Sequence, residues 1–535
     1  MYSSSQVRKI WSEFRLSKQH IEAKPVSLVA SSENKSVLFN VAGMQQFVPY
    51  LVGKPHPLGQ RLYNIQRCIR TNDIEGIGDE RHLSMFEMMG NWSLGDYFKV
   101  EALTWTVEFL VDVLWIPKHR LGATIFAWDE ATNIPRDVES YNILRSLGIE
   151  HISELWFDEY GDSDNFWTPG AIGPCGPCCE FYYDRWVDGQ IYIDPITDND
   201  MASDWDIWVN DRYTEIWNNV FMAYYQDWSG NGFTPLSQTN VDTGMWFERL
   251  MMVLQNTQTL FETDLFMPII QQIEQLTHTQ YISHFKAYRV ILDHLRASIF
   301  LIADGVTPSN EWRWYILRRL IRRAYYYIWQ LVQDHQLNIT KQILWYIQAH
   351  YKLDYPHIVM DPVSIISECI KFQRTLDQGR VMLADIIAKT QDMIDGDTVF
   401  KLYDTYGFPS ELTIEIAWHN HKLVDQAWFE SALFNAQERS RANANFKNTI
   451  DRSKYLWGIS ETKFIWYDHL TSSEFSVLSD FDVNGRRVIV LDQTVFYPEM
   501  GWQRGDSGFM MLATGEQVTV TDTIKFAGVI LHLVE

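Results

Sequence analysis

Glycine is scarce in this chain of 535 residues, because its 28 glycines make up about 5%, against roughly 7% in an average protein, while tryptophan reaches 22. Cysteine is scarce as well, and an odd total of five argues against a disulfide framework. The sequence has no run of about 18 uncharged apolar residues, and its N-terminal stretch lacks the apolar core of a signal peptide. These absences predict a protein of a reducing, cytoplasmic setting with no membrane partner.

Positive charge is also in deficit, with 45 Lys and Arg against 68 Asp and Glu and a formal net charge of −23. This balance disfavours a protein that coats polyanions non-specifically, and we expect no DNA partner. A local basic patch can still dock RNA on an acidic protein. Since 46% of the residues are hydrophobic and 21% charged, the chain is globular, and its length suggests about three domains.

Changes of periodicity along the chain predict where these domains lie. Residues 1–255 mix short β-rich runs with helical stretches, which is typical of an α+β domain. Long amphipathic patterns then dominate 256–465 and predict a helical domain. Residues 466–535 hold short β-branched runs split by turn residues, which indicate a small β-barrel or sandwich. The chain ends inside that β region, as a fragment of a longer protein would.

The segment 314–324 predicts a helix with a basic face. Its apolar residues share one arc, and four arginines fill the opposite arc: Arg318, Arg319, Arg322 and Arg323. Arg313 comes just before them. Such a face is either solvated or paired with Asp and Glu of the same chain, or it binds the phosphates of a nucleic acid. The spacing alone does not choose between these alternatives.

Residues 66–99 read QRCIRTNDIEGIGDERHLSMFEMMGNWSLGDYFK. Arg70 leads a polar turn that His82, Phe86 and Glu87 follow. This arrangement resembles motif 2 of the class II aminoacyl-tRNA synthetases, in which two antiparallel strands and their loop hold ATP. The stretch FEMMGNWSLGDYFK resembles the alanyl-tRNA synthetase family in particular.

Further blocks of that family follow in its order. They are VLFNVAGMQQF (37–47), DNFWTPGAIGPCGPCCEFYYD (164–184), EIWNNVFM (215–222), VDTGMWFERL (241–250), RVILDHLRASIFLIADGVTPSNEWRWYILRRLIRRA (289–324), FKLYDTYGFPSELT (400–413) and LDQTVFYPEMGWQRGDSG (491–508). The resemblance implies a class II antiparallel sheet flanked by helices in 1–255, an all-helical tRNA-recognition domain in 256–465, and a partial β-barrel in 466–535, before an editing domain that is absent.

The resemblance also implies chemistry at named residues. The family activates L-alanine with ATP and Mg²⁺ and passes it to the 3′ end of tRNA(Ala). By similarity, Arg70 neutralises the α-phosphate and Arg249 of FERL holds the outer phosphates, so that these two are the catalytic residues. His82 and Phe86 shape the nucleotide pocket. Planar, bidentate arginine suits phosphate oxygens, which supports the two arginine roles.

Substrate recognition is implied in the same way. Asp242 resembles the carboxylate that binds the ammonium of alanine, with Trp167, Asn218 and Gly244 at the alanine pocket. Asn310 and Asp404 match the residues that read the G·U pair of the acceptor stem, and this context favours an RNA-contacting role for the basic face. Arg313 belongs to that predicted tRNA-binding set. The alternative of a class II-core ligase for another amino acid or a non-tRNA acceptor is disfavoured, because a non-tRNA enzyme would have no use for these residues.

No metal site is expected. Cys175, Cys178 and Cys179 lie close together, but a structural zinc site usually needs a second pair of ligands, and no second CxxC exists. The HxxxH of the family's editing site is absent from the sequence as well. We therefore do not expect zinc in this segment.

Several tryptophans stand where the family has glycine. They are Trp115, Trp186, Trp246, Trp312, Trp314, Trp428, Trp466 and Trp502. Our hypothesis is that UGA codons read as glycine by the source organism were translated as tryptophan; glycine at all eight would restore a content of about 7%. The alternative is a catalytically disabled, tRNA-binding relative, because an indole at position 246 would intrude on the adenylate pocket.

Overall fold

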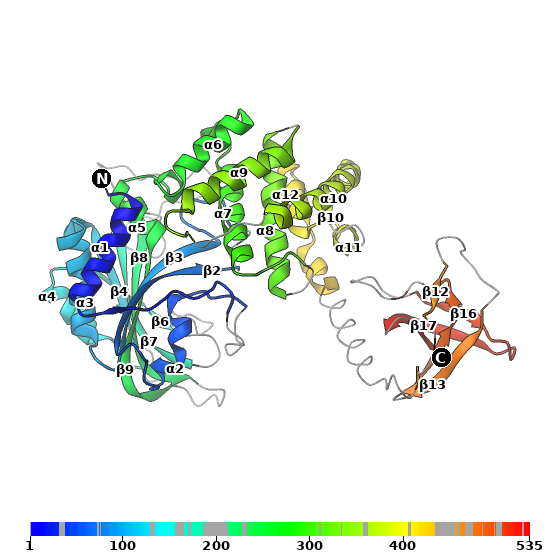
Figure 1. The fold of residues 1–535 in the computed structure, drawn as a ribbon, viewed down its shortest axis with the longest axis horizontal. Helices are drawn as coiled ribbons and strands as arrows, with labels where there is room; N and C mark the ends of the chain where they lie inside the picture. Colours follow the sequence, from blue (N-terminus) through cyan, green and yellow to red (C-terminus); the bar gives the residue numbers. More distant parts are fainter. Residues whose placement is uncertain are drawn as a thin grey trace. The chain divides into compact units, whose positions relative to one another are not determined.

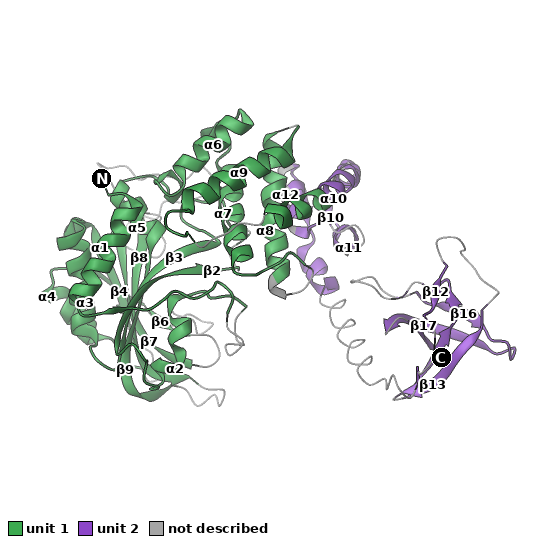
Figure 2. Ribbon diagram, in the orientation of Figure 1, with its two compact units in different colours: residues 1–372 green, residues 373–535 purple. Residues whose placement is uncertain are grey.

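A computed structural model describes most of the chain in two compact units, residues 1–372 and 373–535 (Figure 2). The described residues are 2–30, 38–71, 74, 76–128, 134–155, 165–168, 173–185, 212–226, 233–309, 312–332, 334–356, 362–404, 408–433, 455–456, 459, 461–465, 475–483, 485–496, 498, 506–526 and 529–534.

A mixed sheet forms the centre of the first unit (Figure 1). Within the described residues its order is β1-β2-β3-β9-β8-β7-β4-β5, and β6 pairs with β7. The pairs from β2 through to β4 are antiparallel, whereas β1 with β2 and β4 with β5 are parallel. The strands are β1 (Ile21–Glu22), β2 (Arg61–Ile69), β3 (Met85–Leu94), β4 (Leu121–Phe126), β5 (His151–Leu155), β6 (Phe166–Trp167), β7 (Gly173–Asp184), β8 (Tyr213–Gln226) and β9 (Phe233–Trp246).

Helices α1 and α3 pack on one face of this sheet. In α1 (Ser4–Ser17), which begins with a Ser3–Gln6 capping box, Trp11 is fully buried and packs edge-on against Trp217 of β8 at 5.6 Å between ring centroids. Thr106 of α3 (Lys99–Val107) donates to Asn219 Oδ1 of the same strand at 3.0 Å. Trp217 and Asn219 of β8 thus face α1 and α3, so that Asn218 between them points to the opposite side.

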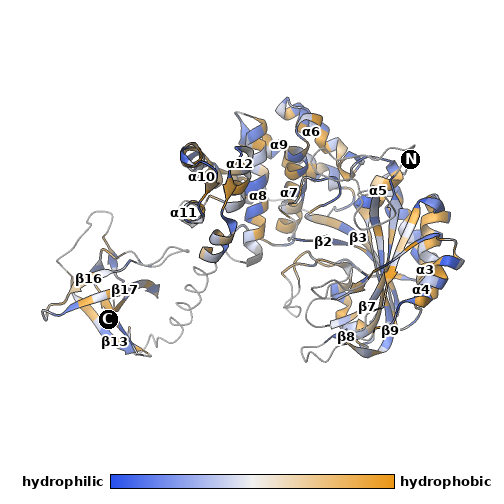
Figure 3. Cartoon of the chain, turned by 180° about the vertical axis from the view of Figure 1, so that it is seen from behind, coloured by the Kyte–Doolittle hydropathy of each residue, from blue (hydrophilic) through white to orange (hydrophobic). Residues whose placement is uncertain are grey.

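The rest of the first unit is mainly helical, as predicted. Figure 3 shows polar and apolar residues side by side along these helices, in keeping with their amphipathic patterns. The other described α-helices up to residue 389 are α2 (Val48–Leu51), α4 (Val138–Ser146), α5 (Phe247–Gln255), α6 (Met267–Thr277), α7 (Phe285–Ala303), α8 (Trp312–Leu331), α9 (Gln336–Tyr351) and α10 (Pro362–Lys389). Short helical turns are η1 (Gly43–Phe47), η2 (Glu108–Val113), η3 (Lys118–Arg120), η4 (Leu260–Glu262) and η5 (Tyr281–Ser283). None of the described helices has the length and apolar character needed to cross a membrane.

In its described residues, the second unit contains the end of α10, two further helices, a five-stranded sheet and two two-stranded sheets. Its elements are α11 (Gly396–Asp404), α12 (Ser410–His419), β10 (Met393–Ile394), β11 (Leu423–Val424), β12 (Lys463–Phe464), β13 (Val477–Val483), β14 (Arg486–Leu491), β15 (Gln493–Thr494), β16 (Gly508–Met511), β17 (Gln517–Phe526) and β18 (Val529–Val534). Five described strands pair antiparallel in the order β13-β14-β18-β17-β16.

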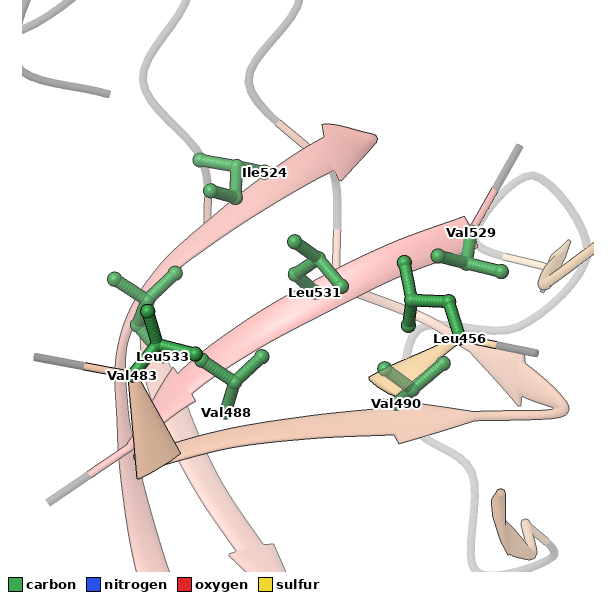
Figure 4. Packing of buried hydrophobic residues seen from close by; sticks show 8 residues of the cluster. All are labelled: Leu456, Val483, Val488, Val490, Ile524, Val529, Leu531 and Leu533. Atoms are coloured by element: carbon green, nitrogen blue, oxygen red, sulfur yellow. The ribbon is translucent and has the colours of Figure 1, made fainter. Parts of the chain in front are cut away.

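Two neighbouring strands of this second sheet, β14 and β18, carry buried apolar residues on both faces. Val488 and Val490 belong to one buried cluster, together with Leu531 and Leu533 (Figure 4), whereas Ile489 belongs to a cluster on the other side. The α+β fold is thus confirmed. Closure of the last segment into a barrel and domain boundaries at 255 and 465 stay predictions.

Candidate active site

Several predicted site residues share the face of the central sheet that α1 and α3 leave uncovered. Asn218 of β8 pairs directly with Gly244 of β9, and directly paired residues point to the same face. Asp242 and Trp246 lie two residues before and two residues after Gly244 on the same strand, so they share its face. The predicted alanine-binding residues of β8 and β9 are therefore neighbours, and Trp246 lies beside them.

Phe86 and Arg70 reach this face from the neighbouring strands. Met88 of β3 pairs with Trp246, which places Phe86, two residues earlier, on the same face. Arg70 directly follows β2, and its Cζ lies 5.2 Å from the centroid of the Phe86 ring and 5.4 Å from that of the Trp246 indole. Its Nε donates to Val41 O at 3.5 Å. The predicted nucleotide-binding residues thus adjoin the predicted alanine-binding residues.

The Trp246 indole fills a planar slot between the Phe86 ring and the Arg249 guanidinium. Its indole is parallel to the Phe86 ring, with centroids 3.8 Å apart and an interplanar angle of 4°. The guanidinium of Arg249 lies 4.1 Å from the indole centroid. Only 4% of Trp246 is exposed. An aromatic ring beneath and a cation above make a site for a flat, electron-rich bicycle, and in this chain the indole occupies it.

Arg249 is held in place by a residue that the sequence analysis did not single out. It lies in the first turn of α5, and its Nη1 donates to Glu215 Oε2 at 2.7 Å and to Glu215 O at 3.1 Å. A bonded carboxylate and the Trp246 ring fix the direction of the guanidinium. Glu215 opens the EIWNNVFM block, which is the signal that could have pointed to it.

His82 is placed on the turn between β2 and β3. Its ring nitrogen Nδ1 contacts the Asp79 carboxylate, and its backbone N–H donates to Asp79 Oδ1 at 2.9 Å. Burial opposes ionisation of Asp79, but the bonds from His82 hold the pKa of this carboxyl below its ordinary value. With 41% of its side chain exposed, His82 is accessible to a ligand. Its nucleotide-binding role stays a prediction.

Asp242 is a buried carboxyl group on the shared face. Burial raises its pKa to about 7, and within the described residues no cationic side chain forms an ion pair with it. A buried carboxylate becomes favourable when a cation reaches it. The position therefore suits the ammonium group of an amino acid.

The other predicted alanine residues lie around Asp242 in different settings. Asn218 Nδ2 donates to Glu180 Oε1 of β7 at 2.9 Å, which fixes the amide. Gly244 is closely covered, because a Cβ there would lie 2.6 Å from Met88 Sδ. Trp167 of β6 pairs with Gly176 of β7 and is half-buried. Their roles in binding alanine stay predictions.

The residues predicted to read tRNA are described only in part. Asn310 lies outside the described residues. Arg313 lies in α8, and Asp404 is the last residue of α11 in the second unit. The side chains of Arg313 and Asp404 lie outside the described residues as well, so the tRNA roles of all three stay predictions.

The basic face of α8 is partly engaged within the protein. Glu368 of α10, with 2% of its side chain exposed, forms ion pairs with Arg318 Nε at 3.1 Å and with Arg322 Nε at 2.8 Å. Arg323 is buried and donates from Nη1 to Ile74 O at 2.8 Å. These contacts correspond to the intramolecular alternative that the sequence left open. The RNA-binding role of these three arginines stays a prediction that their contacts do not favour.

Arg319 lies on the same helix and is half-buried, and its predicted tRNA contact stays a prediction too.

The cysteines of β7 are buried thiols. Burial raises the pKa of Cys175 to about 12 and those of Cys178 and Cys179 well above their ordinary value, which disfavours the thiolate that metals bind. Across the described ranges, no group of three or more His, Cys, Asp or Glu could hold a metal ion.

The family model for class II (A) tRNA synthetases matches residues 6–535. An alanine–tRNA ligase of Colwellia psychrerythraea is 36% identical over 563 residues, covering 99% of this chain and 61% of the relative. One of Cytophaga hutchinsonii is also 36% identical, covering 100% and 61%. The chain thus spans about three-fifths of the length of these curated relatives. The match to a solved structure of apo histidyl-tRNA synthetase of S. aureus covers 47% of this chain and 67% of the synthetase chain, at 14% identity. Its TM-score of 0.28 is too low to bear on the fold.

Proposed function

This chain belongs to the class II (A) tRNA synthetases, and from that membership we propose that it is the activating part of an alanine–tRNA ligase. It joins L-alanine to ATP as alanyl-adenylate and transfers the alanine to the 3′ end of tRNA(Ala), in the cytoplasm. Relatives matched along nearly the whole chain carry the name alanine–tRNA ligase, which supports the choice of amino acid and acceptor.

The observation that carries the proposal is that Asp242 and Trp246 share one face of the sheet and that Arg70 Cζ lies 5.4 Å from the Trp246 indole. Asp242 supplies a negative charge for the ammonium of alanine, and Arg70 supplies a positive charge for the α-phosphate. Alanine held at one end presents its carboxylate to phosphorus at the other. The carboxylate attacks, pyrophosphate leaves, and no covalent protein nucleophile is needed because positioning and charge stabilisation carry the step.

Mg²⁺ would enter with the phosphates of ATP. This ion keeps several waters and needs only one or two protein carboxylates, and it neutralises phosphate charge when bound. Glu215, which binds Arg249 beside the slot, is a described carboxylate on that side. One carboxylate and the phosphates fit such a site.

The nucleotide slot supports a further part of the proposal, that the active form carries glycine at position 246. An indole and a purine are flat bicycles of similar size, so that Trp246 and the base of ATP would compete for the space between Phe86 and Arg249. Trp115 supports glycine in the same way, since its φ of 60° lies in the left-handed region that glycine favours. Its side chain is 77% exposed and gains little from packing. Ordinary UGG codons at these positions would contradict the codon hypothesis.

The filled slot also favours a second candidate, a tRNA-binding relative that no longer activates an amino acid. It predicts tRNA affinity with no adenylate formation, whichever residue stands at the other seven positions.

The test is ATP–pyrophosphate exchange by the chain with glycine at all eight positions, offered each of the twenty amino acids. Exchange that depends on alanine, with weaker exchange on glycine and serine, is the expected result, because a small pocket cannot strongly reject a slightly different side chain. Asp242→Asn in the same background should abolish it. Exchange driven best by another amino acid would overturn the alanine assignment, and tRNA binding without any exchange would support the second candidate.

A further inference from the structure

We propose that one polar face of α7 positions the turn between β2 and β3, with Asp293 as its principal positioning residue for ATP binding. The inference rests on the proposed function, because that turn begins at Arg70 and contains His82. None of the α7 residues concerned belongs to the sites considered above.

Three residues of α7 make up this face. Arg289, Asp293 and Arg296 are spaced by four and three positions, which aligns them along one side of the helix, and each is buried. Arg289 Nη1 donates to Gly78 O at 2.9 Å, and Arg296 Nη1 donates to Met85 O at 2.9 Å. This face therefore contacts the turn at Gly78 and the start of β3 at Met85.

Asp293 holds the residue that connects the turn to Arg70. Its Oδ1 accepts the backbone N–H of Ser84 at 2.9 Å, and its Oδ2 accepts the Ser84 hydroxyl. Ser84 O in turn accepts the backbone N–H of Arg70 at 2.9 Å. Asp293 is thus separated from the backbone of Arg70 by a single residue, through charge-assisted hydrogen bonds that are stronger than neutral ones.

A second line of contacts reaches the turn through α8. His294 Nδ1 lies 2.8 Å from Asp293 Oδ2, and His294 Nε2 lies 3.0 Å from Arg323 Nη1. A guanidinium only donates, so Nε2 accepts and the proton of the neutral ring sits on Nδ1, from which it is donated to Asp293. Arg323 Nη1 also donates to Ile74 O at 2.8 Å. The same carboxylate is thereby oriented from both sides.

The turn depends on the side chains of α7 and α8 because its own backbone carbonyls are buried. The backbone carbonyls of Ile74 and Gly78 in the turn, and of Met85 at the start of β3, accept hydrogen bonds from side chains of α7 and α8. Buried carbonyls without donors would cost free energy, so the turn is stable only in the position where these side chains meet it. Gly78, at φ +134°, also approaches α7 closely, since a Cβ there would lie 2.8 Å from Lys286 Cγ. The helix face therefore fixes where Arg70 stands.

The test uses Asp293→Asn in the full chain with glycine at position 246. The amide keeps the shape but places an N–H₂ group against Ser84 and His294, both of which donate. We expect the dissociation constant of ATP to rise tenfold or more by calorimetry, while the KM of alanine stays within twofold. Amide hydrogen exchange should quicken in residues 76–86 and not in β7 or β8. Ser298→Ala is the matched control, because Ser298 is buried on α7 and its hydroxyl donates to His294 O of the same helix.

Ser84→Ala is the milder second variant, and it removes only the hydroxyl bond. It should weaken ATP binding about threefold in the same direction, so it reports even where Asp293→Asn fails to fold. Unchanged ATP binding and unchanged exchange of residues 76–86 in a folded variant would overturn the positioning role. A glycine-246 parent that binds ATP but shows no alanine-dependent exchange would instead contradict the proposed function, and ATP binding would still decide the role of Asp293.

Discussion

Trp246 lies flat on Phe86, with 3.8 Å between the ring centroids and 4° between the planes. Phe86 belongs to the segment that resembles motif 2, and Trp246 stands where that resemblance predicts glycine. The contact therefore joins the part of the chain that predicts ATP binding to the residue that, on our proposal, obstructs it.

Replacing Trp246 by glycine should couple stability to ATP. Removal of a buried indole leaves an unfilled slot, and we expect the free energy of unfolding to fall by about 3–5 kcal/mol without ligand. ATP at about 100 times its dissociation constant should return roughly 2.7 kcal/mol. Thermal unfolding with and without ATP measures both effects. An ATP-induced shift of equal size in the chain with tryptophan would show that the indole does not compete for the slot.

Alanine binding should depend on pH through Asp242. Burial raises the pKa of this carboxyl to about 7, so that below that pH it is protonated and offers no charge to an ammonium group. In the glycine-246 form, the KM of alanine should fall as the pH rises through about 7 and then level off. The KM of ATP, measured in parallel, is the control. A flat alanine profile across this range would remove Asp242 from the alanine site.

The same group should shape the stability of the protein without substrate. A carboxyl whose folded pKa lies near 7, above an unfolded value of about 3.9, binds its proton more tightly when folded. Stability is therefore highest below pH 4 on this account and declines as the pH rises to 7. Asp242→Asn lacks this decline and should be more stable than its parent at pH 8, by about 1–3 kcal/mol.

Denaturant unfolding at pH 5 and pH 8 checks this difference. Burial raises the pKa of Glu87 to about 7 as well, and only the difference between the variant and its parent isolates Asp242. A variant less stable than its parent at pH 8 would contradict the account.

Arg322 should matter to the fold more than to tRNA. Its Nε lies 2.8 Å from the buried Glu368 carboxylate, and Arg322→Ala should lower the free energy of unfolding by about 1–3 kcal/mol. The salt dependence of tRNA affinity should stay the same, because each lost phosphate contact would reduce its slope by about one. Arg313→Ala, from the same helix, is the comparison and should reduce that slope. A reduced slope for Arg322→Ala would contradict this account and show that Arg322 contacts an RNA phosphate.

Local pattern predicted the α+β fold well, because strand alternation and helical periodicity are written into neighbouring residues. The motif blocks also predicted that Phe86 and Trp246 belong to one site, and the register of β3 and β9 places them on one face. Partners remote in sequence were beyond such reasoning. Glu368 meets Arg322 only after α8 and α10 pack, and Asp293 meets Ser84 only after α7 packs on the sheet. The spacing of the four arginines alone does not tell whether they meet a buried carboxylate or solvent.

The most direct measurement is alanine-dependent ATP–pyrophosphate exchange by two proteins that differ only at position 246, one with tryptophan and one with glycine. The account predicts exchange by the glycine form and at least a hundredfold less by the tryptophan form, because the indole holds the place between Phe86 and Arg249. Equal exchange by both would contradict the central claim that Trp246 closes the nucleotide slot.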